Sequence, residues 1–188
     1  MAERTNMKDR TREAILNAFN TLIESNDFDK ITIQMIIDEA GVGRTTFYRY
    51  FKDKYDVMNY NYERYLQEYL MTGKVQTFED FFNIMTADGT EFFRHIQKIF
   101  DSNGANSFQN YLYEASFYAV QMIFAMRGHP QLTPTEYLQY SFLCHGIPHL
   151  YESWIKGMYP EELTSEEAAK AIYDLLPEAI QGNLWEMK

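Results

Sequence analysis

The stretch ITIQMIIDEAGVGRTTFYRYFKDKYD, residues 31–56, decides how this chain folds. It predicts two short helices joined by a glycine turn. Thr32 is a suitable N-cap for the first helix. Four apolar residues follow at i, i+3, i+4 and i+7, which gives that helix one buried face: Ile33, Ile36, Ile37 and Ala40. Gly41 stands where a left-handed residue commonly ends a helix, so the pattern predicts a helix-turn-helix.

The second helix of the motif is expected to bury Phe47 and Phe51, which lie four residues apart on one face. At about 100° per residue, Thr45 and Arg49 point away from that face. Arg44 falls in the first turn, where a recognition helix usually meets base edges. The helix is therefore predicted to present polar side chains to DNA while two phenylalanines anchor it.

The run AGVGRTTFYRYFKDK, residues 40–54, resembles the signature of the TetR/AcrR family of bacterial transcription regulators, and the resemblance covers about residues 8–58. It implies an all-α, homodimeric protein that binds double-stranded DNA at a near-palindromic operator. The residues that it implies for DNA contact are Arg44 and Thr45 for bases, Tyr48 and Tyr50 for bases or phosphates, and Thr32, Thr46 and Lys54 for phosphates. Tyr50 lies close enough to the Phe47 side that a core position is the alternative.

The acidic charge of the chain is concentrated outside the motif. The net charge is −10, but residues 1–60 hold nine Lys or Arg and ten Asp or Glu, whereas residues 61–188 hold eight and seventeen. The cations of the first part cluster before residue 13 and around the recognition helix, where Arg49 joins the predicted DNA contacts. Phosphate binding depends on such a local basic face. The lead-in around Arg4 and Lys8 is either an arm that reaches DNA or a solvated tail.

The helical pattern predicts about nine helices, no strands and two domains. The expected helices span residues 9–25, the two helices of the motif, 53–71, 77–87, 90–101, 108–127, 134–157 and 164–181, with a polar loop, SNDFDK, at 25–30. Residues 1–53 are expected to form the DNA-binding domain and residues 54–188 an effector-binding and dimerisation domain. The helix at 53–71 would connect them, with Asp53 as its N-cap.

The second domain is expected to bind a small-molecule effector and a second copy of the chain. In the family that the motif resembles, the last two helices usually pair with those of a partner. Residues 108–126 are rich in aromatic and methionine side chains, which suit a lipophilic ligand, although helical spacing places most of them in the core. Tyr113, Phe117 and Tyr118 are the residues predicted to line a pocket.

Other classes of protein find little support in the sequence. No nucleophile elbow or phosphate-binding glycine loop is present, so we expect no enzyme and no cofactor. His145 and His149 have a spacing that can bind zinc, with Cys144 and Glu152 nearby, but Pro148 lies between them and packing is the expected role. A single cysteine, a polar start and the lack of a long apolar run predict a cytoplasmic protein without membrane spans.

The function predicted from the sequence is a homodimeric repressor that an effector releases from its operator. Three alternatives stay open: an activator of the same family, a regulator that responds to a protein, and an interaction protein with little DNA binding.

Overall fold

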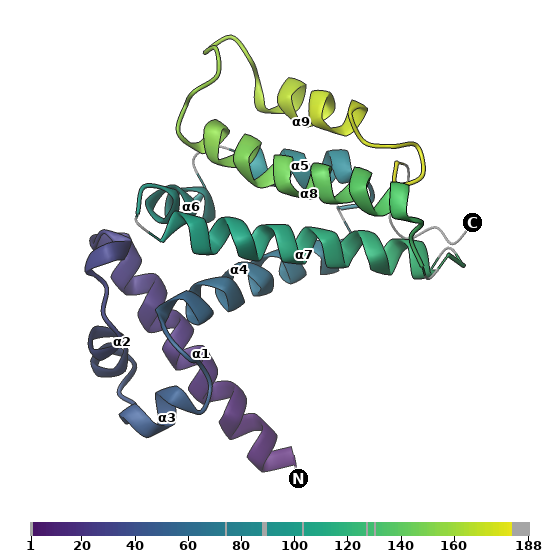
Figure 1. The fold of residues 1–188 in the computed structure, drawn as a ribbon. Coiled ribbons are helices and arrows are strands. Elements are labelled where there is room, and N and C mark those ends of the chain that lie inside the picture. The colour runs from purple at the N-terminus through teal and green to yellow at the C-terminus, as the bar shows by residue number, and fades with distance from the viewer. Residues whose placement is uncertain are drawn as a thin grey trace.

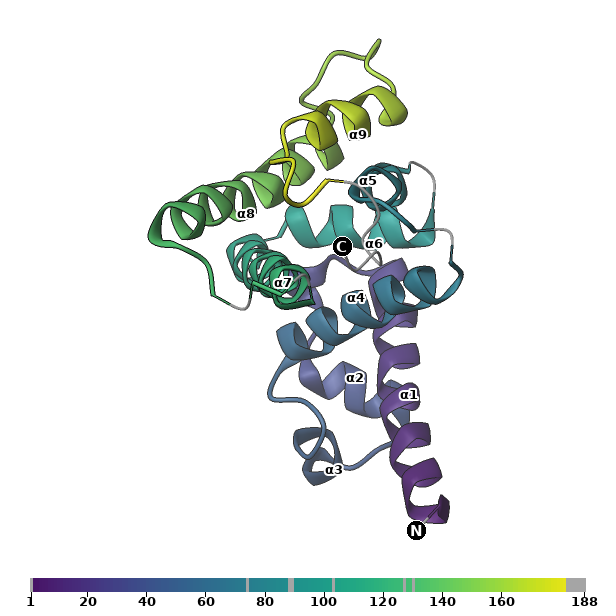
Figure 2. The same cartoon turned by 90° about the vertical axis from the view of Figure 1, so that its right-hand side faces the viewer.

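Two groups of helices, joined by one long helix, make up the fold in the computed structural model (Figures 1 and 2). The structure describes residues 2–73, 75–87, 90–102, 104–126, 128–129 and 131–181. Within these ranges it contains nine α-helices, one 3-10 helix and no strand, which confirms the predicted all-α class. The elements are α1 (Ala2–Ser25), η1 (Phe28–Lys30), α2 (Ile33–Ala40), α3 (Arg44–Tyr48), α4 (Lys54–Met71), α5 (Phe78–Thr86), α6 (Glu91–Phe100), α7 (Ala105–Met126), α8 (Pro134–Ile155) and α9 (Ser165–Asp174).

Side-chain caps fix the beginnings of several helices. The Thr32 hydroxyl accepts from the backbone N–H of Met35 at 3.2 Å and starts α2, as predicted. Gly41 ends α2 with φ 63°, in the left-handed region that costs glycine least. Reciprocal capping boxes start α5, α8 and α9, and their threonine and acidic residues are Thr77 with Asp80, Thr133 with Glu136, and Thr164 with Glu167.

Three helix ends differ from the sequence-based expectation. The first helix begins at Ala2 instead of about residue 9, since no Gly or Pro interrupts this stretch, so the basic lead-in has helical backbone. Helix α3 ends at Tyr48, although Phe51 was expected on the same helix. After Tyr48 the N–H of Tyr50 bonds to the carbonyl of Phe47 in a tighter turn. Helix α9 ends at Asp174 instead of about residue 181, because Pro177 disfavours helical backbone before it.

The main core runs through both groups of helices. Phe19 of α1, Phe47 of α3, Met58 of α4 and Phe100 of α6 belong to one continuous cluster of buried side chains. A second cluster lies among α5, α7, α8 and α9. Figures 1 and 2 show α1, α2 and α3 at one end, α5 to α9 at the other, and α4 between them. The domain boundary near residue 53 stays a prediction, but the two parts share buried surface.

Direct contacts also join the two groups where α1 ends. Lys98 of α6 donates from Nζ to the carbonyl oxygens of Ile23 and Glu24, both at 2.6 Å, and so caps the C-terminal end of α1. The start of α7 approaches the same region, because a Cβ on Gly104 would lie 3.0 Å from the Phe28 ring and 2.6 Å from the Tyr55 ring. The larger group of helices therefore touches the segment that leads into the helix-turn-helix.

Candidate functional site

Helix α3 carries an exposed polar face on a fully buried anchor. Phe47 has no exposed surface, whereas Arg44, Thr45 and Arg49 are exposed and Tyr48 is 47% exposed. The side chains that the sequence assigned to DNA contact at these four positions therefore face solvent together. Such an arrangement gives a short helix the means to contact base edges without losing core packing.

A hydrogen-bonded chain holds Arg44 against α2. Its guanidinium donates to the Gln34 amide oxygen at 3.0 Å, and the Gln34 amide nitrogen donates to Asp38 at 2.8 Å. Sequence reasoning did not single out Gln34, although its exposed position one residue after the start of α2 was visible in the helical pattern. These two hydrogen bonds restrict the rotamers of Arg44, which lowers the entropy cost of placing its guanidinium group against a base.

Tyr50 lies partly buried beside two arginines. The guanidinium groups of Arg49 and Arg12 lie 5.4 Å and 5.8 Å from the centre of its ring. Arg12 of α1 also lies 5.0 Å from the ring of Tyr60 and donates to its hydroxyl at 3.2 Å. The Tyr50 ring packs against the main core and supports the two basic side chains beside it. Its assignment to DNA contact stays a prediction.

The two threonines expected at phosphates occupy different surroundings. Thr32 is exposed, and its hydroxyl is used as the cap of α2. Thr46 is half-buried on α3, beside Phe47. Their assignment to phosphate contact stays a prediction.

Lys54 is hydrogen-bonded to backbone carbonyls in and just after η1, the 3-10 helix before α2. Its Nζ donates to the carbonyl oxygens of Phe28 (2.8 Å), Asp29 (3.3 Å) and Ile31 (3.0 Å), and lies 4.5 Å from the centre of the Phe28 ring. An ammonium group has three N–H donors, so these carbonyls take all of them. Burial lowers the pKa of Lys54. In this conformation the side chain ties α4 to η1 instead of pointing at a phosphate.

Replacing Lys54 with methionine is expected to lower the free energy of unfolding by about 1–3 kcal/mol, the usual effect of losing charged hydrogen bonds to partly buried carbonyls. Urea denaturation measures this loss. Lys52→Met is the matched control, because Lys52 is exposed and two residues away. Unchanged stability, together with uniformly weaker DNA binding and a flatter salt dependence, would instead assign Lys54 to phosphate contact.

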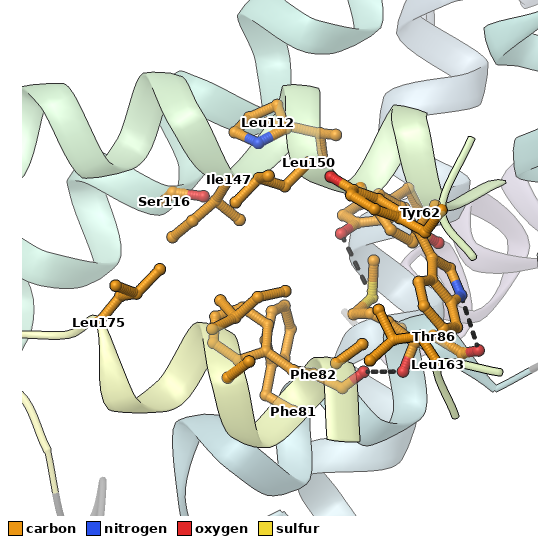
Figure 3. Close-up of a pocket in the computed structure, with 18 residues that line it drawn as sticks. Tyr62, Phe81, Phe82, Thr86, Leu112, Ser116, Ile147, Leu150, Leu163 and Leu175 are labelled. Atoms are coloured by element: carbon orange, nitrogen blue, oxygen red, sulfur yellow. Dashed lines mark hydrogen bonds between the residues drawn. The ribbon is translucent and has the colours of Figure 1, made fainter. Parts of the chain in front are cut away.

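An apolar cavity lies in the larger group of helices. Its volume is about 220 Å³, and α4, α5, α7, α8 and α9 all contribute to its wall, with no charged side chain among the lining residues. Figure 3 shows Phe81 and Phe82 of α5 on one side of the open space, and Leu112, Ile147 and Leu150 on the other. The chain thus has room for a small molecule beside α4, which also contacts the helix-turn-helix group.

The residues predicted from sequence to line a pocket do not line this cavity. Leu112 and Ser116, four residues apart, are the α7 side chains in its wall. Tyr113 and Phe117 each come one residue later and are turned by about 100°, into the second core cluster. Tyr118 is 64% exposed. Their assignment to an effector pocket stays a prediction, because aromatic content does not reveal which side of a buried helix meets a void.

The histidine pair of α8 takes part in side-chain contacts at the α7 surface. The ring of His145 lies 3.8 Å from that of Tyr113, and the ring of His149 lies within 3.2 Å of the Gln109 amide. Cys144 is buried in the second core cluster. Across the part of the chain that the structure describes, no three His, Cys, Asp or Glu side chains are grouped so that they could hold a metal ion.

Besides the residues that line the cavity, α8 has apolar side chains that face outward. Leu138 and Phe142 lie four residues apart on it and are 72% and 77% exposed; Leu175, just after α9, is 68% exposed. Phe142 and Leu175 also line a groove between α8 and α9. Contiguous exposed apolar side chains of this size commonly mark an interface.

None of the described helices is both long enough and apolar enough to cross a bilayer.

Both groups of helices match models of known protein families. Residues 15–60 match a family model described as "Bacterial regulatory proteins, tetR family", and residues 76–178 match one described as "Transcriptional regulator C-terminal region". A solved structure described as "Dihydroxyacetone kinase operon activator DhaS" is similar with a TM-score of 0.53 and 22% identity, over 88% of this chain and 93% of that one. At this identity the likeness concerns the fold. Among curated proteins, none matches the chain.

Proposed function

Since this chain belongs to the tetR family of bacterial transcription regulators, we propose that it is a homodimeric repressor, released from a near-palindromic operator by a small molecule. Helix α3 of each subunit enters the major groove at one half-site. A molecule in the cavity favours a conformation in which the two recognition helices are wrongly spaced for DNA. By linkage, the operator then weakens binding of that molecule equally.

The observation that carries this proposal is the exposed face of α3, with Arg44 held in place by Gln34. In the proposed complex Arg44, Thr45 and Tyr48 read bases. Thr32 and Thr46 contact phosphates beside them, and Arg49 adds a further contact to the DNA. Tyr50 and Lys54 support this surface from behind, because their side chains are engaged with arginines and backbone carbonyls respectively.

Selection of bound duplexes from a random DNA pool tests the proposal. At about 150 mM salt, non-specific electrostatic binding is weak, so enrichment reports base reading. We expect a near-palindrome with two half-sites. A folded, dimeric protein that enriches no sequence in the absence of ligands would contradict the proposal.

Replacing Arg44 with alanine is expected to reduce discrimination at one or two base positions of each half-site, by about 1–3 kcal/mol, because a guanidinium that bonds two base acceptors has no substitute there. Affinities for single-base operator variants, measured by fluorescence anisotropy, check this. Lys52→Ala is the control, because Lys52 is an exposed cation close to the end of α3, which we propose contacts a phosphate. Its loss should weaken binding to all sequences alike and reduce the slope of log affinity against log salt by about one. Equal losses on every variant for Arg44→Ala would remove it from base reading.

Two features of the larger group of helices support the remaining parts of the proposal. The cavity touches α4, whose first turn is bound to the helix-turn-helix group through Lys54, so a ligand and DNA can influence one another. The exposed apolar surface of α8 and α9, containing Leu138, Phe142 and Leu175, offers the contact for a second copy. Dimerisation doubles the DNA contacts and so raises affinity strongly.

An activator is the second candidate, favoured by the printed description of the structural neighbour as an operon activator. Transcription in vitro from a promoter carrying the selected operator separates the two. Less transcript on adding the protein identifies a repressor, and more transcript identifies an activator. Reversal by a purified protein, but by no small molecule, would identify a protein-responsive regulator.

A further inference from the structure

The cavity among α4, α5, α7, α8 and α9 has an apolar wall. Its lining residues include six aromatic side chains, and none of them is charged. Moving an ion from water into such surroundings is very costly unless a partner charge is present. Aromatic side chains, in contrast, gain dispersion and edge-to-face contacts from a flat ring. The wall therefore favours a neutral molecule over an ion.

Most hydrogen-bond donors of the wall are already used within the protein. The Thr86 hydroxyl donates to the carbonyl oxygen of Phe82 at 2.8 Å, and the Trp154 indole N–H donates to the carbonyl oxygen of Thr86 at 3.2 Å. The Tyr62 hydroxyl donates to the sulfur of Met85 at 3.6 Å (Figure 3). A ligand that bonded to one of these donors would have to displace a contact that holds the wall together.

The three other hydroxyl groups of the wall do not form a polar end of the cavity. The oxygen of Tyr151 is enclosed by protein and has almost no accessible surface, so it is closed off from the cavity. Tyr159 also lines the neighbouring groove beside Lys156, which places it at the edge of the cavity. Ser116 is a single serine on α7, and a helical serine can bond to its own helix. A molecule with several polar groups would therefore leave most of them unpaired, which is unfavourable.

The volume narrows the size of the ligand. Typical pockets for drug-sized ligands occupy roughly 300–1,000 Å³, whereas a cavity of about 150 Å³ holds benzene. At about 220 Å³ this cavity suits one ring with a few additional atoms. A ligand of two or more fused rings would require the helices to move apart.

We propose that the cavity binds a neutral, hydrocarbon-like molecule of about one substituted aromatic ring, which is recognised by shape and dispersion and not by hydrogen bonds. Its ring lies between Phe81 and Phe82 of α5 and the aliphatic side chains of α7 and α8 that face them (Figure 3). It also contacts Tyr62 of α4, the helix that begins at Lys54. Polyols, carboxylates and amines are then poor ligands. The inference rests on the proposed function only in making this molecule the effector.

Three probes of nearly equal size test the class of ligand by titration calorimetry with the full-length protein: ethylbenzene, benzyl alcohol and benzoate. Benzyl alcohol has a hydroxyl group where ethylbenzene has a methyl group, and benzoate is charged. We expect ethylbenzene to bind at least about tenfold more tightly than benzyl alcohol, because a buried hydroxyl without a partner loses its hydrogen bonds to water, and benzoate to bind most weakly. Equal or tighter binding of benzyl alcohol or benzoate, or no binding of ethylbenzene, would overturn the proposal.

Two variants test whether the cavity is the binding site. Ala168 of α9 is buried in the wall, and a leucine there would occupy part of the void. We expect Ala168→Leu to weaken the binding of ethylbenzene at least about tenfold, since the void then loses the space for a ring. Ala119→Leu is the matched control, because Ala119 is an exposed residue of α7 outside the wall, and it should leave the affinity unchanged. Unchanged affinity in Ala168→Leu would place the molecule elsewhere and overturn the proposal. If Ala168→Leu does not fold, the three probes with the wild-type protein still decide the class of ligand.

A third variant tests whether the hydroxyl group on α7 takes part in recognition. Ser116→Ala should keep the preference for ethylbenzene over benzyl alcohol, because the proposed ligand needs no hydrogen bond from this residue. A loss of affinity in Ser116→Ala that is larger for benzyl alcohol than for ethylbenzene would show that the cavity binds a polar group, contrary to the proposal.

The selection of DNA sequences is independent of these titrations. Enrichment of an operator without binding of ethylbenzene would contradict the ligand inference and leave the proposed regulator standing. Binding of ethylbenzene without enrichment of an operator would do the reverse.

Discussion

Replacing Phe28 with alanine is expected to lower the free energy of unfolding by about 3–5 kcal/mol, the range for deleting a fully buried aromatic ring. Phe28 has no exposed surface. Its ring meets those of Phe19 and Tyr55 edge to face, with centroids 6.3 Å and 5.4 Å away, and the Lys54 ammonium lies over it at 4.5 Å. Three elements, α1, α4 and the start of α7, therefore pack against one side chain.

Urea denaturation followed by circular dichroism measures this loss. Met71→Ala is the control, because Met71 at the end of α4 is 89% exposed and its truncation should change stability by no more than about 0.5 kcal/mol. The loss of stability in Phe28→Leu should lie between those of Phe28→Ala and Met71→Ala, since leucine keeps most of the apolar volume. A loss below 1 kcal/mol for Phe28→Ala would show that the surrounding helices close the void and that this contact does not hold the two groups together.

Replacing Phe142 with glutamate is expected to convert the proposed homodimer to monomers, weakening association by at least about 30-fold. A central aromatic side chain in an interface commonly contributes 2 kcal/mol or more, and a buried carboxylate adds a desolvation cost. Phe142 is 77% exposed in the single chain and lies beside Leu138 and the groove at Leu175.

Sedimentation equilibrium across a range of concentrations measures the change, and affinity for a complete operator should fall with it because one half-site gives weak binding. Tyr118→Glu is the matched control: Tyr118 is an exposed aromatic residue of α7, outside the α8 and α9 groove. A Phe142→Glu protein that remains dimeric, or a Tyr118→Glu protein that dissociates, would place the interface on another surface.

Local signals in the sequence were sufficient for the helix-turn-helix. The N-cap at Thr32, the left-handed Gly41 and the burial of Phe47 each depend on interactions between residues close in the chain, and the structure has all three. The capping box at Thr164 is likewise formed by residues close in the chain. Short-range hydrogen bonds and helical periodicity are encoded in adjacent residues, so they can be read without knowing the fold.

Longer-range contacts explain where the sequence-based expectations were incomplete. SNDFDK at residues 25–30 was expected to be a polar loop, yet Phe28 begins a 3-10 turn and enters the core because α4 and α7 cover it. Lys54 was expected at a phosphate, yet its ammonium meets carbonyls more than 20 residues earlier. Neither partner is near in sequence, so no periodic pattern could indicate the contact.

The sequence by itself determined the class of fold, the position of the recognition helix and the polar residues that it exposes, because each follows from interactions within one or two helical turns. Only the tertiary structure decided which face of α7 meets the cavity and how α4 is tied to the segment before α2. A void and its wall arise from the angles at which several helices pack, and these angles depend on the summed shapes of distant side chains.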